Sequence, residues 1–183
     1  EGYPPERSIY ESVLARTGIH EVDQSTGLAH FRTPPEKGQH NLYPVWDHLE
    51  RRIFSGDTSR VDIQALFEEI CKPPFGVPEG VIPLLLGAFF IQNKDELFLY
   101  HQGSFIADPE PADFELLASR PDLFSISGSR LNGMRQVIVN RIAKGLNVSP
   151  KTAPVVRALC RIVFGLPQIT LQHQELVTKK QSE

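Results

Sequence analysis

Residues 128–135, GSRLNGMR, have the glycine spacing of a phosphate-binding P-loop, and a possible strand precedes them. Such a loop needs a lysine that reaches the β- and γ-phosphates and a serine or threonine that binds Mg²⁺. Met134 and Arg135 occupy those two positions, and neither side chain can replace the missing ligands. We therefore predict a flexible entry to a helix here, and no nucleotide cofactor.

The other side chains with catalytic potential are dispersed along the chain. The six histidines include no i, i+4 pair and no cysteine at a zinc-ligand spacing, so we predict no metal site. Cys71 and Cys160 lie in apolar helical patterns, which indicates buried free thiols in a reducing compartment, the cytoplasm. We expect a chain that is not an enzyme.

Charge is distributed unevenly between the two ends of the chain. Residues 1–128 contain 10 Lys and Arg against 20 Asp and Glu, whereas residues 129–183 contain 9 against 2. The basic end could bind a polyanion, an acidic partner, or the acidic front of the same chain. The candidate interaction residues are six cations of this end: Arg130, Arg141, Lys144, Lys151, Arg157 and Arg161.

The first three of these cations belong together on a helical wheel of residues 130–146. Arg130, Arg141 and Lys144 fall along one edge of an apolar stripe. The stripe consists of Leu131, Met134, Ile138 and Ile142.

Apolar periodicity and turn residues predict several short elements. The expected helices are residues 5–16, 42–54, 61–71 (capped by Thr58 or Ser59), 78–91, 113–120, 130–146 and 151–164 (entered through Ser149 and Pro150). The expected strands are residues 28–32, 96–100, 104–106 and 123–126.

Three helices followed by a hairpin at residues 96–106 is the order of elements in a winged helix-turn-helix. We predict an α+β, mostly α-helical fold, in which a central winged-helix-like unit of three helices and a β-hairpin is flanked by helices. The expected segments are an N-terminal helical segment with a short strand (1–56), the winged-helix-like core (57–110), a basic helical segment (111–172) and a frayed tail (173–183).

The helix at residues 78–91 would be the DNA-reading helix of such a unit. A reading helix needs Arg, Lys, Asn or Gln toward the major groove. This one has Glu79 as its only charge and is apolar nearly all round, which predicts burial on both sides. Pro83 and Gly87 interrupt the longest apolar stretch, which is far too short to span a bilayer. We expect no membrane association.

Several motifs resemble a block in large bacterial ATPases. They are PPFGV at residues 73–77, GVIPLLL at 80–86, the strand LFLY at 97–100, GSF at 103–105 and FGLP at 164–167. The block is similar to one downstream of the ATPase core in P-loop (AAA-type) ATPases of phage-defence and restriction-like systems, including bacteriophage-exclusion loci. The resemblance covers roughly residues 8–170 and transfers no catalytic residue, because the nucleotide motifs of those ATPases are not in this segment.

The resemblance implies a module of a larger protein, an expectation that agrees with a chain beginning at Glu1 rather than Met. We expect a non-catalytic interaction or regulatory module of a cytoplasmic bacterial ATPase, whose partners are other domains or subunits of that assembly. The alternative is a winged-helix module that contacts the phosphate backbone of nucleic acid, without sequence specificity, through the basic C-terminal helices.

Overall fold

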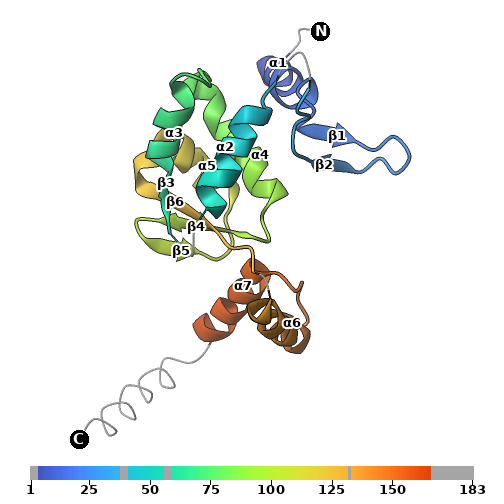
Figure 1. Ribbon diagram of the computed structural model, residues 1–183, viewed down its shortest axis with the longest axis vertical. Helices are drawn as coiled ribbons and strands as arrows, with labels where there is room; N and C mark the ends of the chain where they lie inside the picture. Colours follow the sequence, from blue (N-terminus) through green and yellow to red (C-terminus); the bar gives the residue numbers. More distant parts are fainter. Residues whose placement is uncertain (1–3, 38–40, 56–58, 132, 166–183) are drawn as a thin grey trace, which may run out of the picture. The chain divides into compact units, whose positions relative to one another are not determined.

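The described residues form mostly helices together with two small antiparallel sheets, which confirms the predicted α+β, mostly helical class. The computed structural model describes residues 4–37, 41–55, 59–131 and 133–165 (Figure 1). The chain divides into two compact units, residues 1–130 and 131–183. The first unit includes residues 111–130, which the sequence analysis grouped with the basic helices. The predicted tail at 173–183 lies outside the described residues.

The first unit begins with a short helix and a two-stranded hairpin. Helix α1 (Pro5–Ile9) continues into the π-helical turn η1 (Tyr10–Ala15), so the first predicted helix is confirmed. Strand β1 (His20–Val22) pairs antiparallel with β2 (Ala29–Phe31). Strand β1 is not among the predicted strands, because three residues are too few for a recognisable alternation of apolar and polar side chains.

Three helices and a hairpin follow in the predicted order. The helices are α2 (Tyr43–Phe54), α3 (Ile63–Cys71) and α4 (Ile82–Gln92), and the 3-10 turn η2 (Glu79–Val81) leads into α4. The hairpin consists of β4 (Leu97–His101) and β5 (Ser104–Ile106). Apolar residues at helical spacing form the buried faces: Trp46, Leu49 and Ile53 on α2, and Ile63, Leu66, Phe67 and Ile70 on α3.

Helix α4 is buried over most of its surface, but not on both sides as predicted, because Ile91 is 49% exposed and Leu84 and Gly87 line an open groove. Leu85, Leu86 and Phe89 are all at most 3% exposed. Gly87 lies in the middle of the helix, where an added Cβ would meet no atom within 4 Å. None of the helices in the described ranges has the length and apolar character that a bilayer crossing requires.

The larger sheet differs from the prediction in its central strand. Its strand order is β3-β6-β4-β5, with β3 at Val61–Asp62 and β6 at Phe124–Gly128. Ile126 of β6 lies opposite Val61 on one side and opposite Leu99 of β4 on the other. The hairpin therefore does not close the helices by itself, because the strand between β3 and β4 comes from beyond residue 110.

Residues 107–123 lead the chain from the edge of the sheet back to its centre. Helix α5 (Pro111–Ser119) and the 3-10 turn η3 (Pro121–Leu123) occupy most of this connection. The helix predicted over residues 113–120 is present, but it begins two residues earlier, with Pro111 in its first turn. The Glu110 carboxylate and the Asp113 carboxylate form a reciprocal capping box at the start of α5.

The predicted start of α3 is wrong because strand pairing competes with the helix. Asp62 lies opposite Ser125 of β6, which holds it in an extended conformation with ψ of 127°. The helix consequently begins at Ile63 with Asp62 as N-cap. Ser59 does not cap it, and Thr58 lies outside the described residues.

The starts of both C-terminal helices also lie later than predicted. Helix α6 (Met134–Leu146) begins behind Gly133, whose φ of 62° is incompatible with a helix running on from Arg130. Helix α7 (Thr152–Phe164) has Lys151 as its N-cap, so neither Ser149 nor Pro150 has the predicted role.

Arg130 fixes the end of β6 to helix α2. Its Nη1 donates to Glu50 Oε1 at 2.6 Å, and its Nε donates to Glu96 Oε2 at 2.8 Å. Its guanidinium carbon lies 3.9 Å from the centroid of the Phe54 ring. Gly128 also lies against that ring, and a Cβ at this position would overlap with the ring carbons. Phe54 therefore requires glycine at 128 while it stacks on Arg130.

Glu69 connects α3 to α2. Its carboxylate accepts hydrogen bonds from Arg52 Nε at 3.1 Å and Arg52 Nη2 at 2.8 Å, and it lies 2.8 Å from His48 Nε2. The hydrogen bonds from Arg52 are the main cause that lowers the pKa of Glu69, and partial burial opposes them. The ionised carboxylate is thus the form that stabilises the contact between the helices.

We expect Gly128→Ala to destabilise the first unit by about 1–3 kcal/mol, because Phe54 must move away from its contact with Arg130. The matched control is Gly87→Ala, which introduces the same methyl group into open space in a helix and should raise stability by up to about 1 kcal/mol. Urea unfolding of the full chain, followed by circular dichroism, measures both. A Gly128→Ala variant as stable as the wild type would contradict the assigned packing.

A second prediction concerns Glu69→Gln, which keeps the size of the side chain and removes its charge. Because the folded pKa is below the usual value of 4.5, the carboxylate stabilises the fold above that pH, and the contribution disappears as the pH falls toward the folded pKa. We expect a loss of about 1 kcal/mol at neutral pH, since the group is partly exposed. The difference between the variants should shrink below pH 4.5. A loss independent of pH would show that charge is not the cause.

Candidate functional site

Helices α6 and α7 pack against each other as a helical hairpin, which contains most of the predicted interaction residues. Asn147 ends α6 in the left-handed conformation with φ of 54°, and the Gln136 amide donates to the Pro150 carbonyl oxygen at 3.0 Å. The buried residues of these two helices are small or medium in size: Ala143, Ala153 and Val155. Among the described residues of the hairpin, no large apolar side chain is fully buried.

The predicted basic cluster is partly wrong. Arg130 belongs to the first unit, outside α6, and is ion-paired with Glu50 and Glu96, so it does not extend the row of Arg141 and Lys144. Gly133 could have indicated this, because its positive φ separates the segment that contains Arg130 from α6. The helical wheel assumed instead that the helix starts at Arg130.

Arg141 and Lys144 do lie on α6 as predicted. Both side chains are exposed, and neither has an ion-pair partner among the described residues. On α7, Arg161 is exposed, Arg157 is half-buried, and Lys151 is the exposed N-cap. These last three already take part in interactions of their own. Arg135, the third cation of α6, also takes part in an interaction, so among the predicted cations Arg141 and Lys144 are the two available for a ligand.

The sequence of the hairpin contains cations and no carboxylate of its own. Residues 133–165 contain six Lys and Arg and no Asp or Glu. Exposed cations without a neighbouring carboxylate, such as Arg141 and Lys144, attract anionic ligands.

The apolar stripe of α6 is exposed rather than packed. Met134 is 81% exposed, Val137 58% and Ile138 56%. The helix instead turns Ala143 toward the buried side, because alanine permits close approach of a second helix. Helix α7 has a second set of exposed apolar residues: Leu159, Ile162, Val163 and Phe164. The predicted stripe differs from the exposed stripe of α6 in two residues. Leu131 precedes α6 and is half-buried, and Val137 widens the exposed stripe, so that Arg141 lies within it rather than along its edge.

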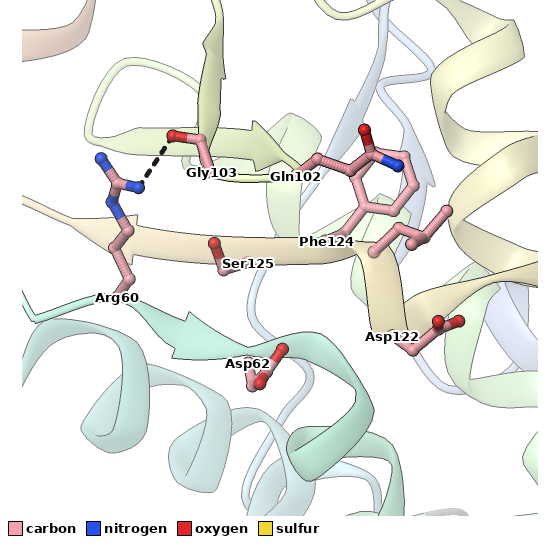
Figure 2. Close-up of a pocket in the computed structure, with 8 residues that line it drawn as sticks. Arg60, Asp62, Gln102, Gly103, Asp122, Phe124 and Ser125 are labelled. Atoms are coloured by element: carbon pink, nitrogen blue, oxygen red, sulfur yellow. Dashed lines mark hydrogen bonds between the residues drawn. The ribbon is translucent and has the colours of Figure 1, made fainter.

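The first unit has a polar cleft of about 330 Å³ between β3, the β4–β5 turn and β6 (Figure 2). In Figure 2 the Arg60 side chain extends to the turn, where it donates to the Gly103 carbonyl oxygen at 2.9 Å. The same guanidinium lies 3.9 Å from the centroid of the Tyr100 ring. Asp62 and Ser125 also line the cleft. Arg60 is therefore held in place rather than free to follow a ligand.

The cleft has no assembled nucleophile and base among its described residues. Ser125 and Asp62 are cross-strand partners, but no hydrogen bond joins their side chains. Asp122 is paired with Arg120, whose hydrogen bonds are the main cause that lowers the pKa of the carboxyl. His101 does not line the cleft: it stacks on Phe124 with 4.8 Å between ring centroids, and its buried Nε2 has no hydrogen-bond partner among the described residues. The cleft can bind polar ligands, but no described base is hydrogen-bonded to the Ser125 hydroxyl.

The first unit also has an apolar groove of about 250 Å³ beside α4. Leu14, Phe31, Leu84, Gly87 and Phe114 are among its lining residues. The groove offers no polar group for chemistry.

The cysteines and the possible metal ligands do not form a site among the described residues. Cys71 and Cys160 are free and half-buried. The described residues contain no group of three or more His, Cys, Asp or Glu that could hold a metal ion. Gly128, the first glycine of the P-loop-like segment, packs against Phe54. Packing explains its presence without a phosphate.

No family model, no curated protein and no solved structure matches this chain. The resemblance to the defence ATPases therefore remains a prediction, and its last motif extends to residues 166 and 167, outside the described part.

We expect the full chain not to bind Mg-ATP, because Met134 and Arg135 cannot supply the lysine and hydroxyl ligands. Isothermal titration calorimetry with Mg-ATP measures this directly. Saturable binding at micromolar concentration that disappears in Gly133→Ala would contradict the prediction.

Proposed function

We propose that this chain is a non-catalytic protein-interaction module and that the α6–α7 hairpin is the element that contacts its partner. The observation that carries the proposal is the combination of available cations and exposed apolar side chains on an element without carboxylates. Exposed apolar residues on a helix are typical of protein contacts, and the charge selects an anionic partner.

The parent protein belongs to the same proposal. On the resemblance of residues 73–105 and 164–167, the module is part of a larger cytoplasmic bacterial ATPase of the phage-defence type, and its partners are other domains or subunits of that assembly. The charge of the hairpin supports an acidic surface on that partner.

Nucleic-acid binding through the hairpin is the second candidate, and the absence of carboxylates from residues 133–165 is the observation in its favour. Two features count against it. Helix α4, in the position of a reading helix, has no charged residue and is buried over most of its surface. Arg130 is paired with two carboxylates and does not contribute to a phosphate contact.

The proposal predicts weak binding of duplex DNA, no tighter than about the 10⁻⁴–10⁻⁶ M non-specific range at physiological salt. Fluorescence anisotropy of a labelled duplex titrated with the full chain measures the affinity. Nanomolar binding that is lost in Arg141→Glu/Lys144→Glu would establish the nucleic-acid function instead. Arg16→Glu/Lys72→Glu, an equal charge change in the first unit, is the matched control.

A further inference from the structure

We infer that the partner surface bound by the hairpin is an acidic amphipathic helix, which lies along the exposed apolar stripe of α6. The inference rests on the proposed function, because it names the partner of the same element. It follows from the spacing of the stripe, the position of one cation within it, and the charge of the surrounding surface.

The stripe has the spacing of a helix-binding face. Met134, Val137, Ile138 and Ile142 are at positions i, i+3, i+4 and i+8, and so follow one side of α6 over more than two turns. All four are exposed, Ile142 least at 37%. An amphipathic helix binds such a face through its own residues at the same spacing.

Arg141 indicates that the partner helix has a carboxylate at the interface. It is i+4 from Val137 and i+3 from Ile138, so it lies beside both within the stripe, while Lys144 is at its edge. A partner that covers the stripe removes water from this guanidinium, and an unpaired charge in such a place is costly. A carboxylate on the partner helix, opposite Arg141, offsets that cost through a bidentate ion pair.

The same features disfavour the other occupants. A second hairpin would bring cations against cations, because residues 133–165 contain no Asp or Glu. An anionic membrane attracts cations at the rim of an apolar face, whereas Arg141 lies in the middle of this one. Nucleic acid binds the cations but leaves Met134, Val137 and Ile138 without a contact.

The test uses the full chain and three synthetic helical peptides. The first has Leu at i, i+3, i+4 and i+7 positions and Glu on the flanks. The second has Lys in place of Glu, and the third keeps Glu and has Ser in place of Leu. Anisotropy titrations should show saturable binding of the first peptide only.

The protein variants locate the contact. Val137→Ser/Ile138→Ser should weaken binding of the first peptide by about tenfold or more, since two apolar side chains leave the interface. Arg141→Gln should weaken it as well. Leu28→Ser, which removes a 69% exposed apolar side chain from the first unit, is the control and should leave the affinity unchanged. All substituted side chains are exposed, and thermal melts verify that the variants fold.

The possible failures are distinct. Equal binding of the Leu-free acidic peptide, or an unchanged affinity in Val137→Ser/Ile138→Ser, would overturn the apolar contact while the anionic protein partner stands. Binding of phosphatidylserine–phosphatidylcholine vesicles but of no peptide would overturn the inference in favour of a membrane surface. Absence of binding to any of the three peptides and to vesicles would also overturn it. Nanomolar duplex binding would overturn the proposed function itself.

Discussion

Strand β6 pairs with β3 on one side and with β4 on the other, and the rest of the first unit depends on this double pairing. The strand brings Phe124 and Ile126, each 1% exposed, into the core formed by the three helices. Without β6, the backbone N–H and C=O groups that β3 and β4 direct toward it would have no hydrogen-bond partners. A segment far from the helices in sequence is thus the part that completes their packing.

The same strand determines where the first unit ends. Gly128 leaves room for the Phe54 ring, and Arg130 stacks on that ring while it pairs with Glu50 and Glu96. These contacts use a cation that sequence reasoning assigned to a basic helix. They also account for a glycine whose spacing resembled a nucleotide loop. The spacing of Gly128 and Arg130 suggested ligand binding, but in the structure these residues contribute packing and ion pairs within the first unit.

The α6–α7 hairpin has the opposite character. It buries Ala143, Ala153 and Val155 and leaves larger apolar residues such as Met134 and Phe164 exposed. So small an apolar contact contributes little of the free energy that ordering two helices costs. A partner that covers the exposed stripe would supply the missing burial. The exposed surface therefore both limits the stability of the isolated hairpin and provides the face for the proposed interaction.

Local patterns determined much of this protein. Side-chain periodicity predicts the buried faces of α2 and α3, the nearly continuous apolar helix α4 and the β4–β5 hairpin. These features depend on neighbours that are close in the sequence. The centre of the sheet, the pairing of Arg130 and the exposure of Met134 depend on which segments meet across long stretches of chain. A helical wheel or a motif spacing cannot predict such long-range contacts, because the same amphipathic pattern is compatible with a buried face and with an exposed one. Only the tertiary structure decided between them.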